Sequence, residues 1–202
     1  MGKGEKGSYK HRQRQKQVAC MVVLALLVAG VALLAVLYFT NFRPKDPKME
    51  VPTMQLLSLY TAGYPATITS ANLTLNVQLS LHNPNKAPFY LLGGSSASLL
   101  YYGASVGSTP LQPVTILAQS STALSAALTV DGPTPLGGPH MYADVASSLL
   151  QVSTSVTILG KVTALNIFSH HSKVVSNCDV SVSLDVRGIE AFTCQKAMSL
   201  NN

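Results

Sequence analysis

The chain contains one unbroken apolar run, which extends from Val18 to Phe39. A helix of this length spans about 33 Å at roughly 1.5 Å per residue, slightly more than the ~30 Å hydrocarbon core of a bilayer. The run carries no charged residue and has no polar face that could meet water, unlike a helix at the surface of a soluble protein. We therefore predict that residues 18–39 form a transmembrane helix.

A cleaved secretion signal is the competing interpretation, because the run is N-terminal and follows a basic segment. Signal sequences carry a shorter apolar stretch of roughly 7–15 residues, followed by a cleavage site with small residues. Here the run ends in Tyr38 and Phe39, which are bulky aromatic residues that favour a membrane interface. The sequence thus favours an uncleaved anchor.

The positive charge of the chain is concentrated before the apolar run. The first sixteen residues contribute six cations and one anion, whereas eight cations and seven anions follow from Asn41 onward. Because basic flanks stay cytoplasmic, we predict that residues 1–17 form a cytoplasmic tail and that the rest of the chain faces the outside or a lumen. The exported part is nearly neutral and lacks a clustered basic face, which argues against a nucleic-acid partner.

Residues 40–53 follow the apolar run and hold three prolines among charged residues. Such a segment is typical of a short, semi-rigid stalk, although it could also be the irregular start of the domain. Residues 54–202 are then expected to form one domain, which is long enough to bury its own core. Its content of Thr, Ser, Val, Leu and Ala, with few charged residues, indicates β structure.

Alternation of apolar and polar residues predicts several strands. The clearest stretch runs from Leu73 to Leu81 and stops at Asn83-Pro84-Asn85, where proline cannot donate to a sheet. The same alternation recurs at residues 124–130, 152–158 and 178–186, and weaker candidates are 54–60, 97–102, 114–117 and 174–175. Strands that each have one polar face favour an all-β, antiparallel sandwich.

One short helix is expected within the sandwich. Residues 131–139 hold three prolines and three glycines and predict an exposed loop. Met141, Val145 and Leu149 then recur at i, i+4 and i+8, as on one face of a helix. Asp144 is expected in the first turn of this helix, where a carboxylate complements the helix dipole.

Two of the three cysteines, Cys178 and Cys194, lie in the exported part, where oxidising conditions favour a disulfide. This bridge would close a loop of about sixteen residues and contribute roughly 3 kcal/mol. A tight two-residue hairpin at Arg187-Gly188 would instead place Cys194 opposite Ser181, so the bridge requires a longer turn or a bulge. Cys20 lies near the start of the apolar run and is either an S-acylation site or an ordinary cysteine of a membrane helix.

Few other residues indicate chemistry. Asn72 begins an N-glycosylation sequon, Asn72-Leu73-Thr74. His140, His170 and His171 lack the spacing of metal ligands, and we expect them in surface loops. Because the sequence holds no nucleophile motif and no glycine-rich phosphate loop, we expect a protein that is not an enzyme and that uses no cofactor.

Three groups of residues resemble a plant family, the harpin-induced-like membrane proteins that carry the late embryogenesis abundant subgroup 2 (LEA type 2) domain. The first group is the strand end Leu79-Ser80-Leu81-His82 followed by Asn83, Pro84, Asn85 and Lys86. The second is Leu99-Leu100 followed by Tyr101, Tyr102 and Gly103, with Gly107, Leu111 and Gln119 further on. The third is Cys178-x-Val180-x-Val182 with the later Cys194. The resemblance extends from about Leu73 to Cys194.

This resemblance implies an immunoglobulin- or fibronectin-III-like sandwich at the plasma membrane, associated with responses to pathogens or dehydration. It implies no catalytic residues, and we expect Asn83-Pro84-Asn85 to end a strand and Tyr101 and Tyr102 to be core aromatics. The expected function is contact with a protein or cell-wall partner at the outer face of the plasma membrane, or at the lumenal face of an endomembrane. The alternative is a lipid-binding or lipid-transfer domain, suggested by long apolar faces, few charges and a nearby bilayer.

Overall fold

The computed structural model describes residues 5–41, 44–62, 70–130, 139–164, 168–195 and 198–199. The chain divides into two compact units, Met1–Arg43 and Pro44–Asn202. The first unit contains helix α1 (Glu5–Asn41), whose Lys16–Tyr38 segment has a mean hydropathy of 3.1 and is long and apolar enough to cross a membrane. This segment coincides closely with the span that the sequence predicts.

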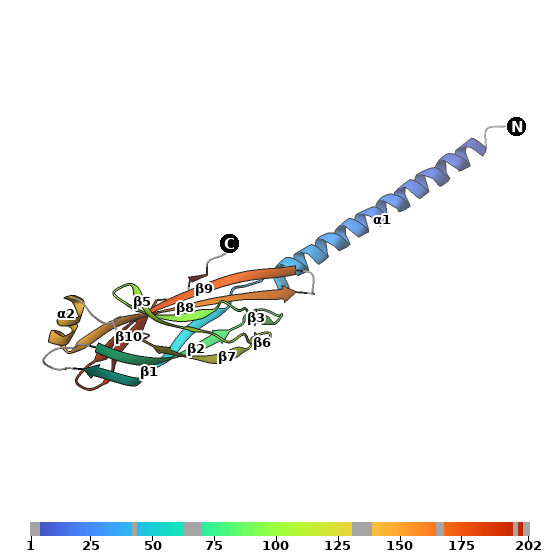
Figure 1. Ribbon diagram of the computed structural model, residues 1–202. Coiled ribbons are helices and arrows are strands. Elements are labelled where there is room, and N and C mark those ends of the chain that lie inside the picture. Colours follow the sequence, from blue (N-terminus) through green and yellow to red (C-terminus); the bar gives the residue numbers. More distant parts are fainter. Residues whose placement is uncertain are drawn as a thin grey trace. The chain divides into compact units, whose positions relative to one another are not determined.

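The second unit consists of two antiparallel sheets and one short helix (Figure 1). Its elements are β1 (Lys48–Ala62), β2 (Ser70–His82), β3 (Phe89–Leu91), β4 (Ser96–Tyr101), β5 (Ala104–Pro110), β6 (Thr115–Ile116), β7 (Ser121–Thr129), α2 (Pro139–Ser147), β8 (Leu149–Ala164), β9 (Phe168–Ser183), β10 (Gly188–Cys194) and β11 (Met198–Ser199). The first sheet has the order β1-β2-β7. The second has the order β10-β9-β8-β3-β6, in which β11 also pairs with β9, and β4 pairs with both β8 and β5.

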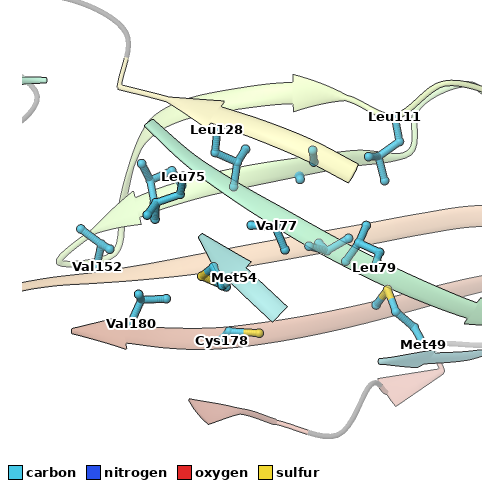
Figure 2. Close-up of a cluster of buried hydrophobic side chains, with 14 of the residues drawn as sticks. Met49, Met54, Leu75, Val77, Leu79, Leu111, Leu128, Val152, Cys178 and Val180 are labelled. Atoms are coloured by element: carbon cyan, nitrogen blue, oxygen red, sulfur yellow. The ribbon is translucent and has the colours of Figure 1, made fainter. Parts of the chain in front are cut away.

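The apolar core lies between the two sheets. The inward residues of β2 are all fully or almost fully buried, as the alternation predicts: Leu73, Leu75, Val77, Leu79 and Leu81. The second sheet contributes residues from β8 and β9, chiefly Val152, Val156, Ile158, Val180 and Val182. Figure 2 shows side chains of both sheets gathered between the ribbons. The period-two pattern of the sequence therefore identifies the buried face of the main strands correctly.

The domain begins earlier than the predicted stalk allows. β1 starts at Lys48, which pairs with His82 of β2, and Met49 is only 5% exposed. Residues 48–53 thus belong to the first sheet and are not part of a stalk. Pro52 has no backbone N–H to donate to a neighbouring strand. It is compatible with β1 because β1 lies at the sheet edge and because the pairing with β2 shifts register between Glu50 and Thr53, where a bulge leaves Pro52 out of the hydrogen-bond ladder.

Two apolar residues lie outside the elements in which the sequence placed them. Val186 is 83% exposed because β9 ends at Ser183 and the chain then turns. α2 ends at Ser147, and Ser148 has a φ of 55°, so Leu149 opens β8 and does not continue the helix. Of the predicted loop, residues 131–138 lie outside the described part of the chain, and Pro139 opens α2.

Thr154 is a polar residue on the buried face of β8, where it is 0% exposed and its hydroxyl has no hydrogen-bond partner within the described part of the structure. Valine has nearly the same shape and removes the buried hydroxyl. We expect Thr154→Val to raise the free energy of unfolding by about 1 kcal/mol. Urea unfolding of the full chain in detergent micelles, followed by tyrosine fluorescence, measures this change.

The matched control for this change is Thr157→Val, which alters a threonine on the solvent-facing side of the same strand. We expect it to change the stability by no more than about 0.5 kcal/mol. A loss of stability in Thr154→Val would mean that the hydroxyl of Thr154 has a hydrogen-bond partner in solution, which would contradict the prediction.

Candidate functional site

Asn83 closes the end of β2 and is 0% exposed. Its side-chain amide nitrogen donates to three backbone carbonyl oxygens, those of Ala87 (2.9 Å), Ile116 (3.2 Å) and Leu117 (3.1 Å). Its Oδ1 accepts hydrogen bonds from both the backbone and the side-chain nitrogen of Asn85, each at 3.0 Å. One buried side chain therefore joins the end of β2 to β6 and the segment that follows it.

Asn85 forms hydrogen bonds with the segment that leads into β1. Its Oδ1 accepts from the backbone nitrogen of Lys45, and its Nδ2 donates to the carbonyl oxygen of Lys45, both at 2.7 Å. The backbone nitrogen of Gln119 donates to the carbonyl oxygen of Asn85 at 3.0 Å. Asn85 is 6% exposed, whereas Lys86 is exposed. The motif therefore ends a strand and also holds residues that are distant in the chain.

Tyr101 and Tyr102 lie where β4 turns into β5. Tyr101 is 4% exposed and its hydroxyl donates to Oδ2 of Asp144 at 2.9 Å. Tyr102 donates to Oδ1 of the same carboxylate at 3.0 Å but is 52% exposed, so the expectation that it is a core aromatic is wrong. The turn has a positive φ at Tyr102 (47°) and at Gly103 (82°), a conformation that glycine adopts without strain.

Asp144 lies in the second turn of α2 and not in the first, and it is 3% exposed. It accepts two phenol hydrogen bonds and so connects the helix to the β4–β5 turn. His140 of the same helix stacks on the ring of Tyr102, with 3.9 Å between the ring centroids. Burial raises the pKa of Tyr101 well above its ordinary value of 10.0, and the hydrogen bond to Asp144 raises it further. The same hydrogen bond raises the pKa of Tyr102.

Removal of the Tyr101 hydroxyl tests this connection. Tyr101→Phe leaves a buried carboxylate with one donor fewer, so we expect the free energy of unfolding at pH 8 to fall by about 2 kcal/mol. Since the folded state has the higher pKa, the contribution of this phenol is complete below pH 10.0 and declines as the pH rises above it.

The loss of stability between pH 8 and pH 11 should therefore be smaller in Tyr101→Phe than in the wild-type chain, in urea unfolding of the full chain in micelles. Tyr90→Phe is the control, because Tyr90 lies on the surface of β3 at 37% exposure. An alkaline loss equal to that of the wild type would contradict the role given to Tyr101.

Cys178 and Cys194 are joined by a disulfide, with their Cα atoms 4.0 Å apart. Their strands pair Gly188 with Ser183 next to the turn, a register that would place Cys194 opposite Asn177. A register shift between Ile189 and Ala191 adds one residue to β10 and brings Cys194 opposite Cys178. The structure thus contains both the longer turn and the bulge that the sequence requires for the bridge.

A cavity of about 610 Å³ opens beside this disulfide. Residues 46–51, which lead into and begin β1, form one wall. The other wall is formed by Val174, Ser176 and Cys194 of the second sheet and by Gln195, which follows β10. Volumes of about 300–1,000 Å³ are usual for small-molecule sites. No local pattern in the sequence predicts this cavity, because its two walls are more than a hundred residues apart in the chain.

The remaining predicted residues are distributed over the surface. Asn72 is exposed on β2, and Cys20 is an exposed free cysteine of α1. His170 and His171 lie in β9 and not in a loop, and Nε2 of His170 is 3.6 Å from Oδ1 of Asp46. Within the described ranges, no group of three or more His, Cys, Asp or Glu residues could hold a metal ion.

The structure defines a class of protein, an antiparallel β-sandwich that follows a candidate membrane helix in the chain. Residues 78–180, just over half of the chain, match the LEA type 2 family model, whose description is late embryogenesis abundant protein. The chain therefore belongs to the LEA type 2 family. No curated protein matches its sequence.

A comparison with solved structures finds matches at low TM-score, of which we give two. A protein from Archaeoglobus fulgidus is 11% identical with a TM-score of 0.34, and the match covers 79% of this chain and 98% of that one. The YcdA protein of Bacillus subtilis is 16% identical with a TM-score of 0.35, and the match covers 57% of this chain and 32% of that one.

Proposed function

We propose that this chain is a single-pass membrane protein whose LEA type 2 domain works outside the cytoplasm. The observation that supports this most directly is α1, in which the Lys16–Tyr38 segment is apolar enough to span a bilayer. The basic residues that precede this segment favour a cytoplasmic N-terminus. The disulfide fits an oxidising compartment on the other side. We place the protein in the plasma membrane, with an endomembrane as the alternative.

The proposed activity is binding at the outer face in pathogen defence or abiotic stress, without catalysis, through a protein or cell-wall partner. Membership of the LEA type 2 family supports this proposal. The motif residues Asn83, Asn85 and Tyr101 support a structural role for the motif, because their side chains make hydrogen bonds within the domain. We further propose an immunoglobulin- or fibronectin-III-like sandwich. Asn72 is proposed to carry an N-linked glycan, and Cys20 is a candidate for S-acylation.

Protease treatment of intact cells tests the topology. For a chain tagged at both ends, we expect added protease to remove the C-terminal tag and to leave the N-terminal tag attached to a fragment containing α1. An Asn72→Gln variant should migrate faster on a gel than the wild type if the sequon is used. Loss of the N-terminal tag alone would show the opposite orientation.

Affinity capture then tests the binding function. A tag on the domain, recovered from intact membranes with and without a stress stimulus, should retain a partner from the outer face. Recovery of cytoplasmic partners only would overturn the proposal.

A second candidate function is lipid binding, and the cavity beside β1 favours it. Its volume of about 610 Å³ lies between walls that include Met49, Val51 and Val174. Native mass spectrometry of the full chain released from lipid nanodiscs should then detect a lipid that survives removal of the annular lipids.

A further inference from the structure

The cavity lies at one edge of the sandwich, where the first strand of one sheet lies beside the last long strand of the other. β1 and β10 are the outer strands of their sheets and contact each other. At the level of residues 46–51 and Cys194 the two sheets leave a space of about 610 Å³. An opening at a sheet edge lets a ligand enter between the sheets without separation of any paired strands.

The inner wall of the cavity is apolar. Val51 and Cys194 are partly buried and present apolar surface to it, whereas Met49 (5% exposed) and Val174 (2% exposed) present little of theirs. Such a wall suits a hydrocarbon chain, because each methylene group that leaves water for this wall contributes about 0.8 kcal/mol.

The volume limits the number of chains. A methylene group is close in size to a water molecule, whose share of the liquid is roughly 30 Å³. The cavity of about 610 Å³ therefore holds about twenty such groups. This is room for one acyl chain of ordinary length.

The mouth of the cavity carries alternating charges. Lys48 and Glu50 line it from alternate positions of β1, about 7 Å apart on one side of the strand, and Asp46 lines it from the segment just before the strand. His170 lies 3.6 Å from Asp46. Two carboxylates with one ammonium between them repel a purely anionic head group. They complement a zwitterion, which brings a cation to the carboxylates and a phosphate to Lys48.

We propose that this cavity binds a lysophospholipid with a zwitterionic head group. The acyl chain lies along the wall that Val51 and Cys194 present, and the phosphate faces Lys48. This inference rests on the second candidate function, lipid binding. The first cavity residue, Asp46, follows Tyr38 by only eight residues in the chain, so the bilayer that α1 is proposed to span is the source that we propose for the ligand.

Photocrosslinking in nanodiscs tests the proposal. The full chain is placed in phosphatidylcholine nanodiscs and irradiated with a lysophosphatidylcholine whose sixteen-carbon chain ends in a diazirine. We expect label on peptides that contain Met49, Val51 or Val174, in addition to any label on α1. Unlabelled lysophosphatidylcholine should compete at a concentration at least tenfold below that required of palmitate.

Two variants assign the label to the cavity. Val51→Trp fills the space and should reduce labelling of the domain at least tenfold, whereas Leu57→Trp should leave it within twofold, because Leu57 lies on the same strand but is 57% exposed outside the cavity. Lys48→Gln should weaken competition by the lysophospholipid but not by palmitate. Absence of thiol labelling at Cys178 and Cys194 under non-reducing conditions shows that each variant retains its disulfide.

The outcomes separate the site from the function on which it rests. Domain label outside the cavity, or equal label in Val51→Trp and the wild type, would overturn the cavity assignment while leaving lipid binding in place. Competition by palmitate as strong as that by the lysophospholipid would overturn the head group. If neither this probe nor a diazirine fatty acid or diacyl lipid labels the domain, lipid binding itself is wrong.

Discussion

Replacement of Asn83 by alanine is expected to lower the free energy of unfolding by about 4 kcal/mol, which is a large share of the stability of an ordinary domain. The change removes the donor to three carbonyl oxygens and the acceptor for two nitrogens of Asn85, in a place that water does not reach. Buried polar groups without partners cost about 1–3 kcal/mol each. Urea unfolding of the full chain in micelles measures the difference.

Two further variants separate the hydrogen bonds from the loss of volume. Asn83→Asp keeps the size and the acceptor oxygens, but an ionised carboxylate cannot donate and would face three carbonyl oxygens, so we expect a loss of stability at least as large as with alanine. Asn177→Ala is the control, since Asn177 is exposed on β9, and it should change the stability by no more than about 0.5 kcal/mol. Wild-type stability of Asn83→Asp would disprove the donor role.

Replacement of Gly107 by alanine is expected to cost about 3 kcal/mol, at the upper end of the usual cost of overpacking. Gly107 of β5 is buried, and a Cβ at this position would overlap the backbone carbonyl oxygen of Thr129 in β7. The backbones of the two sheets approach each other here, and the hydroxyl of Thr109 donates to the carbonyl oxygen of Ala127 at 2.6 Å. Because backbone atoms cannot rotate away as a side chain does, the two strands must separate.

Gly93→Ala is the matched control for this change. Gly93 lies in a turn where an added Cβ meets nothing within 4 Å, so we expect stability within about 0.5 kcal/mol of the wild type. Both variants are compared by thermal unfolding in micelles, with a lower midpoint expected for Gly107→Ala alone. Equal midpoints would mean that β5 and β7 can move apart without loss.

Much of the fold could be predicted because the patterns involved are local. The alternation from Leu73 to Leu81 identifies both the strand and its buried face, since successive side chains of any strand point to opposite sides. The same pattern missed the start of β1 at Lys48–Thr53, because charged residues and Pro52 interrupt the alternation in this paired edge strand. It predicted too much at Val186, which continues the alternation after the chain has begun to turn.

The candidate sites were less predictable because they depend on partners that lie far away in the chain. Asp144 suits the first turn of a helix by its charge, yet its position is determined by Tyr101, 43 residues earlier. Asn85 was predicted as a turn residue, but its amide pairs with Lys45 across 40 residues. The cavity and its charged mouth have no sequence signal at all, since they arise where two sheet edges meet.

The sequence by itself determined that this chain carries an apolar helix long enough for a bilayer, a set of amphipathic strands and two cysteines able to pair. These are properties of composition and period, which the backbone geometry converts directly into elements. Only the tertiary structure decided that one extra residue in β10 aligns Cys194 with Cys178, that Asn83 is satisfied from three directions, and that β1 and β10 leave a cavity. Register and packing join residues that are distant in sequence, so no local pattern specifies them.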